Sequence, residues 1–396
     1  MMTKNDDVFD YLIVGAGIVG LTIAKELTDK EPNATICIIE KEKEVAQHAS
    51  GRNSGILHAG FYYNSDSKKA QHCLRGNALM KEFCCENGIE VKETKKLVVT
   101  KNAGELTQLH EIKRRADANG VQTELISEVE AIAIEPNVST YKKALYSPLT
   151  ASVNPIEVCE KLKENLLKIG VCFLFNTPFS NNLEIDYKYL INAAGLYADK
   201  IAQQYDLAKE YTLLPFKGIY MKVSNQKVPT KINLYPVPDL KFPFLGVHYT
   251  ITSTGDIKIG PSASPAFWRE NYSGFSKFKL VEFLEILMIN AKLFITNSFN
   301  YRNLAIREIK YYWSKNLIKE AEMMVKDAFG SKYEKKNPGI RAQLYNKKTN
   351  KLVTDFIIQH TQNSTHVLNI ISPGFTCSFS LAQEIVKEIR KNKVNC

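Results

Sequence analysis

The first forty residues change their hydrophobic period twice. A short run of apolar and β-branched residues, Tyr11–Val14, predicts a buried strand. Apolar residues then recur at helical spacing over 18–27, which predicts a helix. A second apolar run, 35–39, predicts another buried strand, which ends at Glu40. The pattern therefore predicts a strand–helix–strand unit at the start of the chain.

Three glycines occupy the turn between the first strand and the helix. Gly15, Gly17 and Gly20 follow the spacing G-x-G-x-x-G. Gly15 permits the tight turn, Gly17 lets a pyrophosphate approach the backbone, and Gly20 lets the helix pack closely on the strand. The helix N-terminus offers free N–H groups to phosphate, and Glu40 can accept hydrogen bonds from a ribose. The unit predicts a dinucleotide site but does not choose between FAD and NAD.

Beyond Glu40 the chain continues to alternate between helical and strand-like periods. Helices are expected over 66–87, 105–119 and 156–169 and in parts of 277–330. Strands are expected over 95–100, 171–175, 189–192, 339–344, 351–360 and 366–372, and residues from Leu214 onward have strand composition punctuated by Gly and Pro. A helix that opens at Pro373–Gly374 runs nearly to the end of the chain.

The glycine fingerprint opens the chain and this last helix closes it, so the nucleotide-binding domain is expected to be discontinuous. Residues 1–90, 145–213 and 336–396 are assigned to this domain, and 91–144 and 214–335 to an inserted substrate domain built on a mixed β-sheet. The expected fold class is therefore α/β, with a second domain of α+β character.

Glycines and hydrogen-bond donors gather again in the loop GRNSGILHAGFYY, residues 51–63. A flexible backbone and several donors let such a loop wrap a planar polar ligand. The residues concerned are Ser50, Arg52, Asn53, Ser54 and Gly55. Two more junctions join a strand end to a helix through small residues, at Gly195 and at Gly374. Backbone groups can meet a ligand at both junctions.

The segment 277–295 is strongly amphipathic. We expect this helix to pack on the sheet of the substrate domain. Contact with a membrane surface is the alternative, and a basic segment follows the helix.

Composition and charge limit the classes of partner. The formal net charge of +10 suits nucleic acid, an anionic membrane or an acidic substrate, but the lysines are scattered, which favours a general compositional bias. The eight cysteines have no C-x-x-C spacing, so free thiols and no metal site are expected. Neither a signal peptide nor an apolar run of the ~18 residues that span a bilayer is found. A cytoplasmic protein, peripheral at most on the inner face of the cell membrane, is expected.

Several motifs in order resemble one family over nearly the whole chain. They are VGAGIVG, GRNSGILHAGFYY, SPLTASVNP, INAAGLYAD, LLPFKG, GIRAQL and SPGFTCSFS. The chain resembles the FAD-dependent oxidoreductases of the D-amino-acid oxidase type, and within them the enzymes that oxidise L-2-hydroxyglutarate. Ala151 stands where that family usually has Gly, and the segment before YLINAAG is short, which puts the adenine end near Thr177 and Pro178 in doubt.

The resemblance implies a glutathione-reductase-type FAD-binding domain and FAD rather than NAD. It places Gly15, Gly17, Gly20 and Gly195 at the pyrophosphate. It places Glu40 and Lys41 at the ribose end, the loop 50–55 along the flavin, and Gly374, Phe375 and Thr376 at the pyrimidine side of the ring. Whether Cys377 attaches the flavin covalently stays open.

The implied reaction is the oxidation of L-2-hydroxyglutarate to 2-oxoglutarate. Arg341 is the expected ligand of the C1 carboxylate, because a guanidinium binds a carboxylate bidentately; a structural salt bridge is the alternative. His58 is the expected base because the pKa of His lies near neutrality, and His248 is its alternative or a second substrate ligand. Lys217, Tyr62 and Tyr235 are weaker candidates for the substrate pocket. Quinone and oxygen both remain open as electron acceptors.

Other readings keep the flavin and change the substrate to glycerol 3-phosphate, an amino acid or another 2-hydroxy acid. A flavin-bearing RNA-associated protein is suggested only by the net charge and is disfavoured, because no RNA-binding motif accompanies it.

Overall fold

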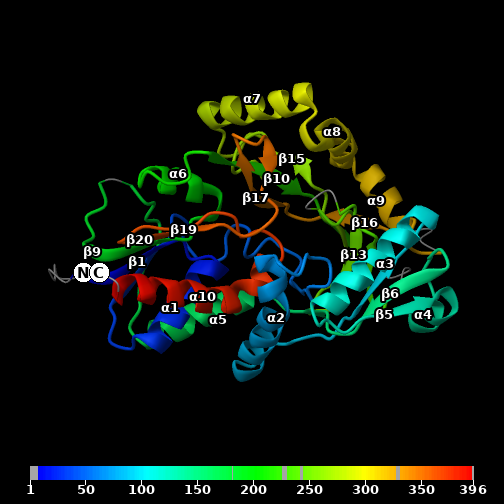
Figure 1. Cartoon of the computed structure of the whole chain (residues 1–396), viewed down its shortest axis with the longest axis horizontal. Coiled ribbons are helices and arrows are strands. Elements are labelled where there is room, and N and C mark those ends of the chain that lie inside the picture. Colours follow the sequence, from blue (N-terminus) through cyan, green and yellow to red (C-terminus); the bar gives the residue numbers. More distant parts are fainter. Residues whose placement is uncertain (1–7, 181, 225–229, 241–243, 327–330, 395–396) are drawn as a thin grey trace.

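The computed structural model describes residues 8–180, 182–224, 230–240, 244–326 and 331–394. Two large β-sheets lie at opposite ends of the molecule, and a smaller sheet connects them (Figure 1). Both termini lie at the end that carries the first of the large sheets (Figure 1).

The first large sheet has six strands. β1 pairs in parallel with β2 and with β9, so the expected strand–helix–strand unit is formed. Only the edge pair β19–β20 is antiparallel among the pairings of this sheet. The strand order is β19 (Ile358–His360), β20 (Ser364–Val367), β9 (Tyr187–Asn192), β1 (Phe9–Val14), β2 (Ile36–Ile39) and β8 (Cys172–Leu174).

Helices pack against this sheet and fill its core with apolar side chains. They are α1 (Ile18–Lys30), α2 (Lys68–Glu86), α5 (Pro155–Lys168) and α10 (Gly374–Val394). α10 lies beside both α1 and α2, which brings the last helix of the chain next to the first (Figure 1). A Cβ on Gly76 of α2 would lie 2.4 Å from the carbonyl oxygen of Thr376, so this glycine permits close packing on the start of α10. The helices expected at the two chain ends are confirmed.

The second large sheet has eight strands, drawn from two separate parts of the chain. The order is β16 (Tyr333–Lys335), β11 (Met221–Val223), β14 (Ile257–Gly260), β13 (His248–Ile251), β12 (Asn233–Pro236), β4 (Lys96–Val99), β6 (Lys143–Ser147) and β5 (Glu124–Ser127). α3 (Ala103–Ala118) covers one face, and α4 (Glu128–Ile134) and α9 (Ser314–Glu322) cover the other.

A four-stranded sheet connects the two halves. Its central pair, β10 (Tyr211–Gly218) and β17 (Gly339–Asn346), is antiparallel over its full length, and β15 (Ser264–Pro265) and β18 (Lys351–Leu352) are its edges. The short strands β3 (Ile56–Leu57) and β7 (Ala151–Ser152) form a separate pair. α6 (Ala198–Gln203) follows β9.

Two strand predictions near the C-terminus are wrong. The expected strand 351–360 is divided into β18 and β19, which belong to different sheets. Asp355 lies between them, and its carboxylate accepts hydrogen bonds from the backbone N–H groups of Lys68 and Lys69, which holds the chain in a crossing between the sheets. The expected strand 366–372 ends at Val367, because β19 and β9 pair only with the start of this segment.

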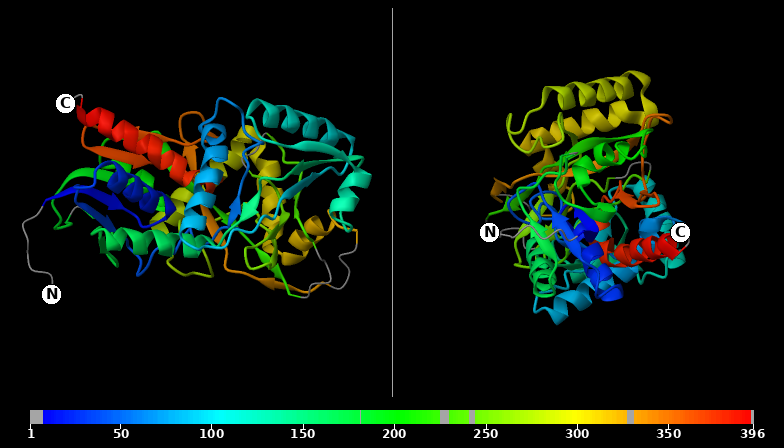
Figure 2. Two further views of the ribbon diagram at one scale, coloured as in Figure 1. Left: turned by 90° about the horizontal axis from the view of Figure 1, so that it is seen from below. Right: turned by 90° about the vertical axis from the view of Figure 1, so that its left-hand side faces the viewer.

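The expectation that the amphipathic helix packs on a sheet is confirmed only in part, because just two of its residues join an apolar cluster with β10, β17 and β18. α7 (Leu280–Thr296) lies along the outer edge of the molecule with α8 (Tyr301–Ile309) beneath it (Figures 1 and 2). Only Ile286 and Leu293 of α7 are buried, whereas Val281 is 79% exposed and Met288 66%. The helix has more apolar residues than a single contact face can bury, so periodicity alone overestimated its packing.

Candidate functional site

A cavity of about 620 Å³ lies between the six-stranded sheet and the inner face of the eight-stranded sheet. It brings together residues that are far apart in the sequence. The predicted site residues that line it are Gly15, Gly17, Glu40, Lys41, Ser50, Arg52, Asn53, Ser54, His58, Gly195, Tyr235, His248, Arg341, Gly374, Phe375 and Thr376.

One end of the cavity is built by the turn between β1 and α1. Gly15 has φ +105°, and a Cβ on it would lie 2.7 Å from the carbonyl oxygen of Ala193. A Cβ on Gly17 would lie 3.0 Å from Ser50 Oγ, which also accepts a hydrogen bond of 2.9 Å from the Ile18 N–H. Glu40 accepts hydrogen bonds from the backbone N–H groups of residues 16 and 42, so its carboxylate is fixed at the end of β2. The geometry leaves backbone exposed at the N-terminus of α1.

His58 lies at the other end, after β3. Its backbone N–H donates to Thr376 Oγ1 at 3.1 Å and its carbonyl accepts from Asn77 Nδ2 at 3.1 Å, so α10 and α2 both hold it. The imidazole is buried, and Nδ1 has no hydrogen-bond partner among the described residues. Burial, and after it the charge of Lys96 and the ring of His248, hold the pKa of His58 well below its usual value. The imidazole is therefore neutral at neutral pH and can accept a proton.

His248 lies on β13 and stacks on the ring of Tyr235, with the ring centroids 3.8 Å apart. Its Nδ1 lies 2.7 Å from the carbonyl oxygen of Gly246, which can only accept, so Nδ1 carries the proton. Nε2 is thus the free acceptor of this ring. Burial lowers the pKa of His248 to about 3, and the positive charges of Lys96 and Arg341 add to this effect. The hydrogen bond to the Gly246 carbonyl opposes the shift.

Arg341 lies on β17 and is half-buried, with its guanidinium 5.5 Å from the centroid of the Phe244 ring. Its Nη1 donates to the carbonyl oxygen of Ser262 at 2.7 Å, and no carboxylate among the described residues lies within salt-bridge distance of the guanidinium. Burial lowers the pKa of Arg341, but a guanidinium stays protonated in proteins. Arg341 is therefore a half-buried cation with N–H donors available to an anion, and the alternative of a structural salt bridge is not found in the described part of the chain.

Four predicted site residues lie outside the cavity lining. A Cβ on Gly20 would lie 2.1 Å from the Gly15 carbonyl oxygen, so this glycine serves the packing of α1 on the turn. Gly55 makes a similar close approach to the Val153 carbonyl. Tyr62 is buried in the core beneath α3, and the Lys217 ammonium lies 5.5 Å from the ring of Tyr312. Cys377, whose link to a flavin was left open, is also buried in the core and does not line the cavity.

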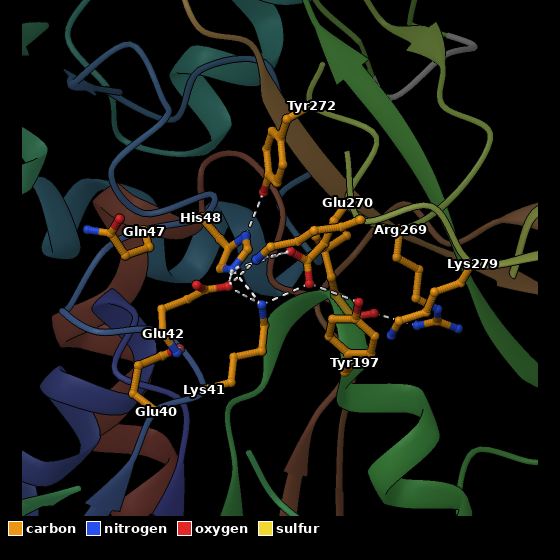
Figure 3. Close-up of polar contacts among 12 residues, drawn as sticks. Glu40, Lys41, Glu42, Gln47, His48, Tyr197, Arg269, Glu270, Tyr272 and Lys279 are labelled. Carbon is orange, nitrogen blue, oxygen red and sulfur yellow. Dashed lines mark hydrogen bonds and ion pairs between the residues drawn. The ribbon is translucent and has the colours of Figure 1, made fainter. Parts of the chain in front are cut away.

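Sequence reasoning missed a charged cluster over the end of the cavity near Lys41. Lys41 Nζ lies 2.8 Å from both Glu270 Oε1 and His48 Nε2, and Tyr197 donates to Glu270 at 2.9 Å (Figure 3). Lys277 binds Glu270 at 2.8 Å and Glu42 at 2.6 Å. The cluster ties the segment before α7 to the loop after β2. No single motif could reveal it, because its members come from 41–48, from residue 197 and from 270–277.

Glu42, His48 and Glu270 offer ligand atoms within 4.8 Å of one another, the spacing of a metal site. Both carboxylates already bind the ammonium groups of Lys41 and Lys277. Burial opposes the ionisation of Glu270, but hydrogen bonds from these lysines outweigh it and lower its pKa to about 2. The cluster is therefore neutralised by the chain's own cations.

Comparison with known proteins gives consistent matches. The model of the family described as FAD dependent oxidoreductase matches residues 10–388. The mitochondrial L-2-hydroxyglutarate dehydrogenase of Caenorhabditis briggsae is 34% identical over 96% of this chain and 93% of its own length. The L-2-hydroxyglutarate dehydrogenase of Indibacter alkaliphilus is 33% identical over 94% of this chain and 96% of its own. The FAD-bound L-α-glycerophosphate oxidase of Mycoplasma pneumoniae superposes with a TM-score of 0.75 at 22% identity, covering 97% of this chain and 95% of that one.

The chain belongs to the FAD-dependent oxidoreductases. It is an enzyme, and its cofactor is FAD, which settles the choice that the glycine fingerprint left open. The expected fold class is confirmed by the family match and by the superposition. The boundaries assigned to the two domains remain a prediction.

The cavity of this FAD-dependent oxidoreductase fits the cofactor that the family carries. A side chain at Gly17 would fill the space beside Ser50 where a pyrophosphate would lie against the backbone, and α10 begins at the opposite side. None of the described helices is both long and apolar enough to span a bilayer.

Proposed function

We propose that this enzyme oxidises L-2-hydroxyglutarate to 2-oxoglutarate. The observation that carries the proposal is the cavity itself, which is lined by a half-buried guanidinium that forms no ion pair with the described residues and by two neutral histidines. A 2-hydroxy acid needs this combination, because its carboxylate needs a cation and its hydroxyl needs a base. The names of the relatives at 33–34% identity support the same substrate.

FAD would be held by the glycine turn, by the loop after β2 and by the start of α10. Its pyrophosphate would meet the turn and Gly195, and its ribose would meet Glu40 and Lys41. The loop 50–55 would run along the flavin, with Gly374, Phe375 and Thr376 beside the ring. Bound FAD supplies the redox chemistry by accepting a hydride from C2 of the substrate.

The chain's own residues bind and orient the substrate and move its proton. Arg341 binds the C1 carboxylate with its free N–H groups and so fixes the position of C2. His58 accepts the hydroxyl proton, because burial keeps its imidazole neutral. His248 lines the same cavity and, with Nε2 free to accept, can hold the hydroxyl, while Tyr235 supports its ring.

A substrate panel tests the proposal. Anaerobic wild-type holoenzyme should lose its oxidised-flavin absorbance on mixing with L-2-hydroxyglutarate, and far more slowly with glycerol 3-phosphate, glycine or D-alanine. Bleaching by one of these three compounds without bleaching by L-2-hydroxyglutarate would contradict it.

We also propose that the electrons pass to a membrane quinone and that α7 holds the enzyme on an anionic bilayer. The outward residues of α7 are apolar, and they include Leu280, Val281, Leu284, Leu287, Met288, Phe294 and Ile295. Between 277 and 319 eight Lys and Arg residues are exposed, whereas none of the three Glu residues falls in the exposed class. An apolar face rimmed by cations is complementary to an anionic lipid surface. Lys279 lies at the start of α7 and also lines the cavity, so the face adjoins the site.

Vesicle sedimentation tests the membrane contact. The holoenzyme should sediment with vesicles of phosphatidylglycerol and phosphatidylcholine, and less with phosphatidylcholine alone. The double variant Val281→Ser/Met288→Ser should lose most of this binding and keep its flavin, because both side chains are exposed. Equal sedimentation of this variant and the wild type would show that α7 is not the contact.

A further inference from the structure

Lys96, on β4, is a buried lysine without a counter-ion. Its side chain is fully buried, and its Nζ has no hydrogen-bond or ion-pair partner in the described ranges of the chain. An ammonium in such a place loses its hydration, and the faces of the Phe61, Tyr62 and Tyr235 rings compensate for only part of this loss, so the position is costly for stability. Most buried charges are paired or serve a function. A role in binding is therefore the natural explanation to test.

The strand register places Lys96 on the cavity side of the eight-stranded sheet. Lys96 is opposite Asn233 in the parallel pair β4–β12, and Tyr235 lies two residues further along β12 on the same face. Tyr235 is in turn opposite His248 on β13. The Lys96 Nζ lies 4.0 Å from the centroid of the Tyr235 ring, and Tyr235 and His248 line the cavity. Lys96 is thus directly behind the cavity wall.

Two of the aromatic rings around Lys96 carry buried hydroxyl groups. The hydroxyl groups of Tyr62 and Tyr235 are buried and have no partner among the described residues, and Lys96 Nζ lies 5.5 Å from the Tyr62 ring. Two hydroxyl donors and one ammonium group with no carboxylate among them form an environment suited to an anion. Burial lowers the pKa of Lys96 to about 7, and a bound anion would raise this pKa and keep the ammonium protonated.

A second cation, Arg341, also lies near His248. The positive charges of Lys96 and Arg341 both help to lower the pKa of His248. Lys96 also lowers the pKa of His58, and Arg341 opposes the rise in the pKa of Tyr220. Lys96 comes from β4 and Arg341 from β17, so the two charges belong to different sheets. Two separated cations around one cavity match the two carboxylates of a dicarboxylate, while a monocarboxylate would use only one of them.

We propose that the Tyr235 hydroxyl group, with the charge of Lys96 directly behind it, forms a subsite for the distal carboxylate and makes the enzyme selective for dicarboxylates. The inference rests on the proposed function and extends it. Arg341 holds the carboxylate beside the reacting carbon. Lys96 acts from behind Tyr235, and its charge favours a second carboxylate at the Tyr235 wall.

Ligand binding to the holoenzyme tests the subsite without turnover. Glutarate carries two carboxylates and butyrate carries one, and neither has a hydroxyl group to oxidise. The change in flavin absorbance reports binding of each. In Lys96→Met the dissociation constant of glutarate should rise about 10-fold, because the variant loses a charge that acts across the Tyr235 ring, while that of butyrate stays within about threefold. Lys96→Gln should show the same change in the two dissociation constants, and it replaces Lys96→Met in the test if that variant folds poorly.

Lys69→Met is the matched control, because Lys69 is also buried but faces Asp355 on the side of α2 and α10. It should keep the wild-type ratio of glutarate to butyrate binding. The subsite is overturned if the Lys96 variants keep the wild-type ratio of the two dissociation constants, or if they bind glutarate and butyrate more weakly by the same factor. Lys96 would then be a structural residue. If the wild-type holoenzyme is not bleached by L-2-hydroxyglutarate at all, the proposed function fails instead, whatever the ratio.

Discussion

Replacement of His58 by alanine should slow anaerobic flavin reduction by L-2-hydroxyglutarate about 10²- to 10⁴-fold, the usual contribution of a general base. The physical reason is the neutral, buried imidazole, whose Nδ1 has no partner among the described residues. Flavin content should stay near that of the wild type, because Thr376 and Asn77 hold the backbone of residue 58 and not its ring. Stopped-flow absorbance of the flavin measures the rate.

The controls separate loss of a base from general damage. His110→Ala removes an exposed histidine of α3 and should leave the rate unchanged. The pH profile adds a second readout, since the base must be neutral and its pKa lies well below 6.5 in the folded protein. The wild-type rate should therefore stay level from pH 8 to 6.5 and fall only when more acidic solution protonates the imidazole. A fall within that range, or a wild-type rate in His58→Ala, would remove His58 from this role.

Replacement of Arg341 by methionine should lower kcat/KM for L-2-hydroxyglutarate by about 10²-fold or more, because each hydrogen bond to a charged group contributes about 1.5–3 kcal/mol. The guanidinium binds the Ser262 carbonyl through Nη1 and forms no ion pair in the described segments, and the buried Glu308 carboxyl acts on it only at longer range. Its remaining donors are thus available for the substrate carboxylate. Steady-state kinetics with an artificial electron acceptor measure the effect.

Arg341→Lys is the informative companion variant. It keeps the charge but loses the planar pair of donors, so its kcat/KM should lie between those of the wild type and of Arg341→Met. Retention of flavin in both variants should accompany these losses, because Arg341 lies on β17 and not on the glycine turn. Wild-type kcat/KM in the methionine variant would show that another group binds the C1 carboxylate.

The local elements near the glycine turn could be predicted because several signals agree there. The period of the apolar residues, the glycine spacing and the terminal Glu40 all indicate the same strand–helix–strand unit, and β1, α1 and β2 form it. The sequence could not show that 351–360 divides between two sheets, because the break depends on Asp355 binding backbone groups of α2, nearly 290 residues away.

The site itself was predictable only in part. Arg341, His58 and His248 stand in recognisable motifs, and the cavity brings them together. Lys96 precedes LVV in a strand whose four residues are all buried, so no alternation of polar and apolar positions marked the face it occupies. The exposure of α7 was missed for the opposite reason, since its apolar residues indicated burial and only the tertiary structure shows which of them lack a partner.

The most direct measurement is a single anaerobic turnover of the wild-type holoenzyme with L-2-hydroxyglutarate, followed by assay of the product. The account predicts complete loss of the oxidised-flavin absorbance and one 2-oxoglutarate formed for each flavin reduced, with no reduction by D-2-hydroxyglutarate. An unchanged flavin spectrum with L-2-hydroxyglutarate, together with rapid reduction by glycerol 3-phosphate or an amino acid, would contradict it.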